Sequence, residues 1–182
     1  MARENNSCYA ILSLLNKKEL SGYGIKALFE KIAHFYWSES NAQIYPMLKQ
    51  LEDQGFVESR LDESSGKRQK RIYAITESGR THLIQWLMQP ISYGGKERNE
   101  LLLKLSNGFA IDKVEVLQHV NNYITHLQMM EIKLTEVVNH INVDHSGRED
   151  QDYLLLVYRY NEKRLKAELE WAKETVQSLQ AM

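Results

Sequence analysis

The sequence predicts a mainly α-helical protein with one small β-hairpin. Three observations support this prediction. Apolar residues recur at helical spacing along most of the 182-residue chain, only two prolines and nine glycines occur, and two short β-type runs flank a glycine-containing turn. Hydrophobic residues make up 43% and charged residues 26%, which are ordinary globular values. The length suits one large domain or a small domain with an extension.

The sequence of the first half predicts, in order, three helices, a hairpin and a fourth helix. Each expected helix has apolar residues three or four positions apart, and polar or capping residues separate the helices. The two strands are joined by a turn that contains Gly66. The expected helices cover residues 5–15, 21–35, 41–54 and 76–87, and the expected strands cover residues 56–61 and 71–75.

A linker separates this half from the rest, because Pro90 to Gly95 combines proline, serine and paired glycines. We therefore expect one domain over residues 1–90 and another over residues 91–182. In the second domain the apolar pattern predicts a short helix over residues 97–105 and two long helices at about 112–143 and 151–179. The two long helices are expected to form an antiparallel hairpin.

Heptad-like apolar stripes run along both long helices. Two helices alone cannot bury such stripes well, so a second copy of the chain is the most economical partner. The second domain is therefore expected to be a helical dimerisation domain. The residues expected at the dimer interface are Leu117, Val120, Ile124, Leu127, Leu134, Tyr158, Leu165, Leu169 and Val176.

The third helix has a polar side opposite its apolar face, and this side suits contact with DNA. Tyr45 and Lys49 can reach phosphates. Asn41 and Gln43 can read base edges or bind the backbone, and the small Ala42 permits a close approach. Three helices followed by a basic hairpin form the winged helix-turn-helix, whose third helix enters the major groove. The competing interpretation is an ordinary solvated helix face.

The hairpin carries a basic cluster, Lys67-Arg68-Gln69-Lys70-Arg71, which we call the basic wing. The whole chain has a net charge of −1, so it lacks the general excess of cations found in many nucleic-acid-binding proteins. A local cluster can still bind phosphates. We expect the wing to supply affinity that is independent of sequence, and the third helix to supply specificity.

Pro46 raises a question about the third helix. A proline inside a helix loses a hydrogen bond and costs roughly 3 kcal/mol. If the helix starts near Ala42, Pro46 lies at the edge of the first turn, where few bonds are lost. A helix that starts earlier would be kinked, which would re-aim its first residues. The sequence leaves both alternatives open.

Three stretches of the first half resemble the PadR family of bacterial transcriptional regulators. They cover Tyr9–Lys26, Phe35–Ser59 and Gly66–Arg80. They contain a Leu-Ser-Gly-Tyr step, the run Ile-Tyr-Pro-x-Leu-x-x-Leu-Glu-x-x-Gly and the ending Tyr-x-x-Thr-x-x-Gly. The long helical second half resembles, by architecture more than by motif, the branch with a virulence-activator-like C-terminal region.

The resemblance implies a homodimer that binds a roughly twofold-symmetric promoter site on double-stranded DNA. Many family members repress genes and some activate them, so a repressor is expected although the direction stays open. By the family's pattern the DNA contacts come from the wing, from the front of the third helix and from a tyrosine in the Ser-Gly-Tyr step. These residues are Tyr23, Asn41, Ala42, Gln43, Tyr45, Lys49, Lys67, Arg68, Gln69 and Lys70.

The resemblance also implies a small-molecule effector, because family members often release DNA when an aromatic or cationic compound binds near the dimer interface. The candidates for such a pocket are Trp86, Tyr93, Phe109 and Tyr123. Packing in a helical core is the competing interpretation of these four aromatic residues. No motif in the sequence identifies the compound.

Other functions find little support in the sequence. The single Cys8 excludes an internal disulfide and a Cys-rich zinc site, and no apolar run approaches the roughly 18 residues of a membrane span. A reduced, cytoplasmic protein is therefore expected. No phosphate loop, nucleophile elbow or His-Glu-x-x-His motif occurs, so we expect neither an enzyme nor a metal or cofactor. The strongest alternative is an adaptor whose winged helix binds protein instead of DNA.

Overall fold

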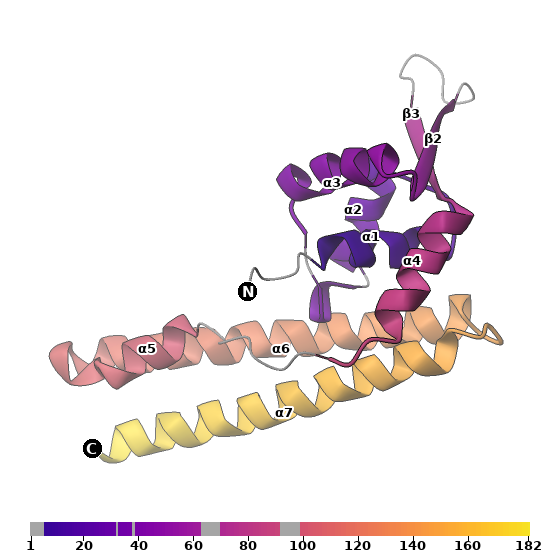
Figure 1. The fold of residues 1–182 in the computed structure, drawn as a ribbon. Coiled ribbons are helices and arrows are strands. Elements are labelled where there is room, and N and C mark those ends of the chain that lie inside the picture. Colours follow the sequence, from indigo (N-terminus) through magenta and orange to yellow (C-terminus); the bar gives the residue numbers. More distant parts are fainter. Residues whose placement is uncertain (1–5, 32, 38, 63–69, 92–98) are drawn as a thin grey trace. The chain divides into compact units, whose positions relative to one another are not determined.

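The computed structural model describes residues 6–31, 33–37, 39–62, 70–91 and 99–182 (Figure 1). The chain forms two compact units, Met1–Ser92 and Tyr93–Met182. The described elements are mainly helices, with one small antiparallel sheet in the first unit. The predicted fold class is therefore confirmed. Within the described ranges, no helix has both the length and the apolar character needed to cross a membrane.

The described residues of the first unit form four α-helices and three strands. Its elements are α1 (Ser7–Leu15), β1 (Leu20–Ser21), α2 (Gly22–Lys31), the 3-10 helix η1 (Ala33–Phe35), α3 (Asn41–Asp53), β2 (Val57–Asp62), β3 (Lys70–Ile75) and α4 (Glu77–Leu87). The strand order is β1-β3-β2, with both pairs antiparallel. The pair β2–β3 extends beyond the helices of this unit as a ribbon (Figure 1).

The strand β1 corrects the sequence prediction, which expected a hairpin of two strands only. Leu20 lies between the first two expected helices, where the sequence predicts no strand, yet it pairs with Tyr73 of β3. A strand of two residues is too short to show the alternation that identifies strands in a sequence. Its partner comes from more than 50 residues further along the chain, so no local pattern indicates it.

The apolar face predicted on α3 is confirmed. Ile44 and Leu48 are fully buried, and Met47 and Leu51 are 8% and 1% exposed. They belong to one core with apolar residues of α1, α2, the sheet and α4. Because these buried side chains hold α3 along its length, the helix cannot rotate about its axis, and its opposite side remains exposed.

The end of α3 is fixed by Gly55. Gly55 has a positive φ of 73°, which residues with a side chain rarely adopt. Its N–H donates to the carbonyl of Glu52, and the N–H of Phe56 donates to the carbonyl of Leu51, at 3.0 and 2.9 Å. These two bonds form a Schellman motif, which satisfies the last carbonyls of the helix.

The start of α4 is fastened to this same corner through Thr76. The Thr76 N–H donates to the carbonyl of Phe56 at 3.0 Å, and its hydroxyl donates to the carbonyl of Gly55 at 2.7 Å. The same hydroxyl oxygen accepts the N–H of Gly79 at 3.1 Å, which makes Thr76 the predicted helix cap. The ends of α3 and β3 therefore meet the first turn of α4 in one hydrogen-bonded corner.

The second unit consists of α5 (Glu100–Ser106), the 3-10 helix η3 (Gly108–Ala110), α6 (Lys113–Asp144) and α7 (Gln151–Ala181). The two long helices α6 and α7 lie side by side as an antiparallel hairpin (Figure 1). Asp112 caps α6 by accepting the N–H of Val114 at 2.8 Å. Both long helices begin and end within two residues of their predicted bounds.

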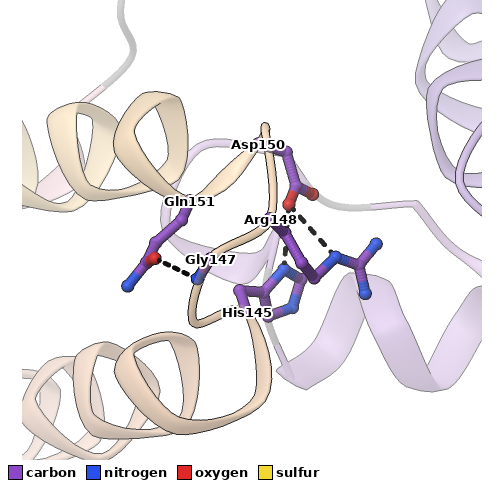
Figure 2. A network of polar contacts seen from close by, with 5 residues as sticks. All are labelled: His145, Gly147, Arg148, Asp150 and Gln151. Carbon is purple, nitrogen blue, oxygen red and sulfur yellow. Dashed lines mark hydrogen bonds and ion pairs between the residues drawn. The ribbon is translucent and has the colours of Figure 1, made fainter.

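The turn between α6 and α7 is held by polar contacts, which Figure 2 shows. Asp150 Oδ1 lies 3.2 Å from His145 Nδ1 and 3.4 Å from Arg148 Nε. Gly147 has a φ of 73°, and its N–H donates to Gln151 Oε1 at 3.0 Å. Asp150 and Gln151 thus stand at the start of α7 and bind the turn that precedes it.

Five of the nine residues expected at a dimer interface are buried within the single chain. Val120, Leu127, Leu134, Tyr158 and Leu165 are at most 5% exposed. The remaining four, Leu117, Ile124, Leu169 and Val176, are half-buried. The stripes that predicted a second chain are therefore satisfied in large part by packing within the chain, where α6 and α7 face each other.

Candidate nucleic-acid interface

The side of α3 opposite the core is exposed and forms the candidate interface. We define the exposed front of α3 as Ala42, Gln43, Tyr45, Pro46 and Lys49, all of which are exposed. Asn41 begins the helix, but its side chain lies outside the described part of the chain. The front thus combines a small residue, an amide, a phenol and a cation on one helix surface.

The first turn of α3 is fixed by Gln43. Its Oε1 accepts the N–H of Ser40 at 3.1 Å and the hydroxyl of Ser40 at 2.9 Å. The bond to the N–H satisfies one of the donors that every helix start leaves without an intrahelical partner. The sequence predicts Gln43 as a reader of bases. The structure adds a capping role for its oxygen, and its amide nitrogen takes no part in these two bonds.

Pro46 is the sixth residue of α3, because the helix begins at Asn41, close to the predicted start. Intrahelical bonding begins with the N–H of Ile44, which donates to the carbonyl of Ser40 at 3.0 Å. In this register the nitrogen of Pro46 is the one that faces the carbonyl of Ala42, and proline has no N–H. One helical hydrogen bond is therefore missing, at the exposed front.

Tyr45 connects the front of α3 to the start of α2, a contact that the sequence reasoning missed. Its ring lies against Gly22, the first residue of α2. A Cβ added to Gly22 would lie 3.0 Å from Tyr45 Cζ and 3.2 Å from its hydroxyl oxygen. The adjacent Tyr23 is 72% exposed and Tyr45 is 51% exposed. The absent side chain at Gly22 thus lets two phenols stand near the same helix start.

The basic wing is described only in part. Lys67, Arg68 and Gln69 lie outside the described residues. Lys70 is exposed at the start of β3 and stands opposite Asp62 in the strand register. Arg71 Nη1 lies 3.5 Å from Glu52 Oε2, so one cation of the wing is paired with a carboxylate of α3.

A polar cluster ties α3 to the sheet beneath the wing. Ser59 donates its hydroxyl to Glu52 Oε1 at 2.5 Å, and Arg71 approaches the other oxygen of that carboxylate. Burial raises the pKa of the neighbouring Tyr73, whose ring is 8% exposed. Further out, Arg60 Nη2 lies 2.5 Å from Glu19 Oε2, and this hydrogen bond raises the pKa of Arg60. These pairs link the ribbon to α3 and to the segment that precedes β1.

The four aromatic residues predicted to line an effector pocket are divided between the two units. Trp86 belongs to the first unit and stacks on Tyr9 with ring centres 4.5 Å apart. Tyr93 lies outside the described residues. In the second unit Phe109 is 90% exposed, whereas Tyr123 donates its hydroxyl to Glu168 Oε2 at 2.5 Å.

The parts of the chain that the structure describes contain no group of three or more His, Cys, Asp or Glu side chains that could hold a metal ion. His140 and His145 lie near each other, but each faces a carboxylate, Asp144 at 2.6 Å and Asp150 at 3.2 Å. This arrangement resembles ion pairs that fasten a helix end.

Comparison with known proteins identifies the family. Residues 11–85 match the Transcriptional regulator PadR-like family, and residues 97–180 match the Virulence activator alpha C-term family. The chain contains a PadR-like transcriptional-regulator domain followed by a domain of the virulence-activator C-terminal type. The first match covers α3 and the wing, and the second covers the long helices. The predicted family and its helical branch are both confirmed.

The relatives are regulators as well. The Negative transcriptional regulator PadR of Bacillus subtilis is 41% identical over 96 residues, which is 53% of this chain and 53% of that protein. The chain spans about half the length of the curated relatives it matches. Because these relatives are transcriptional regulators, the prediction that the chain is not an enzyme is confirmed.

Two solved structures of Bacillus subtilis PadR share the fold. One, in complex with operator DNA, has a TM-score of 0.81 at 27% identity and covers 95% of this chain and 98% of that chain. The other, in complex with p-coumaric acid, has a TM-score of 0.75 at 27% identity and covers 94% of this chain and 97% of that chain.

Proposed function

We propose that the chain is a sequence-specific DNA-binding transcriptional regulator that acts as a homodimer and represses its target genes. Residues 1–90 are the DNA-binding domain and residues 91–182 the dimerisation domain. The observation that carries the proposal is α3, whose buried face fixes it in the core while its opposite face presents exposed polar residues. A helix held in this way can enter the major groove. The relative solved with operator DNA supports the same conclusion.

The proposed DNA contacts divide into two kinds. Three exposed residues carry donors suited to phosphate oxygens: Tyr23, Tyr45 and Lys49. Tyr23 follows Gly22, against which the ring of Tyr45 lies, and Lys49 comes four residues after Tyr45 in α3. The front of α3 reads bases through Asn41 and Gln43, with Ala42 allowing a close approach. The wing adds charge. Its proposed contacts are Lys67, Arg68, Gln69 and Lys70.

Exposed apolar side chains on the long helices support the proposed dimer. Met129 and Ile132 on α6 are 50% and 62% exposed, and Leu156 and Tyr160 on α7 are 58% and 66% exposed. These side chains point away from the seam that buries Leu134 and Tyr158. A second hairpin packed against them would remove apolar area from water, which is the main driving force for obligate association.

The sign of regulation and the effector rest on the relative from Bacillus subtilis. That protein is named a negative regulator, and it has been solved with p-coumaric acid. We extend both properties to this chain as a proposal: repression, relieved by a small aromatic compound. Adding p-coumaric acid to the DNA complex tests it, because release of DNA supports the proposal and unchanged binding at millimolar acid opposes it.

A mobility-shift experiment tests the DNA-binding proposal. The protein is mixed with duplex fragments from upstream of its own gene over a series of salt concentrations. We expect selective retention with a steep salt dependence, because each neutralised phosphate adds about 0.9 to the slope of log K against log salt. Retention of no fragment below about 100 mM salt would contradict regulation by DNA binding and favour the protein-binding adaptor.

Matched lysine variants sharpen this experiment. Replacing the exposed Lys49 with alanine should weaken binding to all sequences alike and lower the salt slope by about 1. The control is Lys113→Ala, an exposed lysine at the start of α6, which should change neither quantity. The dimer is tested separately by light scattering, which should give about twice the chain mass of 21.3 kDa. A monomer at micromolar concentration would contradict the proposed assembly.

A further inference from the structure

One main-chain acceptor on the exposed front of α3 lacks its helical donor. The carbonyl of Ala42 would normally accept the N–H four residues later, but that residue is Pro46. Losing this bond would destabilise an isolated helix. Pro46 lies within α3 and not at its end. The helix is nonetheless continuous from Asn41 to Asp53.

The two residues concerned lie on the solvent-exposed side of α3. Ala42 and Pro46 are both exposed, and the apolar residues that anchor the helix lie on the opposite face. Ala42 carries only a methyl group, so its own side chain does not cover its backbone carbonyl. The proline ring lies against the carbonyl of the residue four positions earlier and brings no N–H to it.

We propose that the Ala42 carbonyl is a specificity-determining acceptor that receives a hydrogen bond from an exocyclic amine of a DNA base. In the major groove such donors occur on only two bases, at N6 of adenine and N4 of cytosine. A carbonyl cannot bind the phosphates, which are themselves acceptors. Its role is therefore base discrimination. This inference rests on the proposed DNA-binding function. It adds a base contact made by the main chain, which is possible because Pro46 has no N–H to occupy the carbonyl.

The expected effect is modest and local. A single hydrogen bond between neutral groups changes an equilibrium by about 2- to 12-fold, less than the bidentate contacts made by arginine or asparagine side chains. One base pair in each half-site should therefore show the preference. The side chains of Asn41 and Gln43 can contact amines as well, so removing an amine from the DNA is not sufficient to identify the reader.

A cycle that combines a protein change with a base change isolates the carbonyl. The preferred site of the wild-type protein is first selected from a randomised duplex library. At each adenine or cytosine of that site the amine is then removed, using purine in place of adenine or pyrimidin-2-one in place of cytosine. The same duplexes are measured with Pro46→Ala, which returns the N–H that occupies the Ala42 carbonyl.

At one position per half-site, removal of the amine should weaken wild-type binding about 3- to 10-fold but weaken binding of Pro46→Ala less than about 2-fold. Lys49→Ala is the matched control from the same helix face, and it should keep the full amine dependence while losing overall affinity. Equal amine dependence in wild type and Pro46→Ala at every position overturns the inference and leaves the DNA-binding proposal intact. Absence of any selected site for the wild-type protein overturns both.

Discussion

Replacing Gly79 with alanine should severely destabilise the first unit, although the change adds one methyl group. Gly79 is buried in the first turn of α4. A Cβ built there would lie 2.9 Å from Ile75 Cγ1 and 3.0 Å from the carbonyl carbon of Phe56, with the carbonyl oxygen closer still. Two of these three atoms belong to the main chain, so no side-chain rotation can relieve the contact.

The loss of unfolding free energy can be estimated from the groups that the added methyl group would displace. Overpacking a buried site costs roughly 1–3 kcal/mol, and a collision with backbone belongs at the upper end of that range. Moving α4 outward also strains the bonds from Thr76 to Phe56 and Gly55, each worth about 1 kcal/mol. Alanine recovers about 1 kcal/mol through its higher helix propensity. The net loss is therefore about 3 kcal/mol, or roughly 12–24 °C in the melting temperature of a unit of this size.

Urea unfolding measures this loss directly. Trp37 and Trp86 lie in the first unit and Trp171 in the second, so a Trp171→Phe background makes tryptophan fluorescence report on the first unit alone. Gly24→Ala is the matched control, because an added Cβ there would be no closer than 3.4 Å to its nearest neighbours, all of which are side-chain atoms. A Gly79→Ala variant within about 1 kcal/mol of wild type would refute the reasoning.

The sequence predicts the helices well because their signals are local and repeated. The 32-residue α6 and the 31-residue α7 each contain several heptads of apolar residues, so single exceptions such as Glu131 and Glu162 do not hide the period. Capping residues then place the ends, as Asp112 does for α6. The same periodicity identifies the exposed front of α3, because its opposite face holds four buried apolar residues.

Features that depend on distant residues could not be predicted in this way. The strand β1 exists because Leu20 meets Tyr73, and Arg60 pairs with Glu19 across 41 positions. The close approach of Tyr45 to Gly22 likewise joins two helices. Each depends on tertiary packing, which a single sequence shows only after the fold is known.

The dimer prediction illustrates a further ambiguity. A heptad stripe shows that a helix face is buried, but it does not tell whether the partner belongs to the same chain or to another. Here Leu127, Leu134 and Leu165 are buried without any second chain. The side chains left for a partner, such as Ile132 and Tyr160, lie outside the stripe.

Three further predictions concern single buried or exposed side chains. Because burial raises the pKa of Tyr73, its neutral phenol favours folding below about pH 10, where an unperturbed tyrosine titrates, and this contribution is lost as the pH rises further. In urea unfolding, the stability of wild type relative to Tyr73→Phe should therefore fall only as the pH rises above about 10. Leu134 is 4% exposed, so Leu134→Ala should lower the unfolding free energy by about 2–5 kcal/mol. Ile132 is 62% exposed, so Ile132→Ala should leave the helix content unchanged and weaken dimerisation, as measured by light scattering. Asn161 is fully buried on α7, where its Nδ2 donates to Val157 at 2.9 Å while Oδ1 lacks a partner among the described residues. Leucine at this position should therefore raise the unfolding free energy by about 1–3 kcal/mol, yet it removes a buried polar group that can disfavour other registers of α6 against α7. Broadened or doubled NMR signals in a more stable Asn161→Leu variant would support this role for Asn161, and a less stable variant would contradict it.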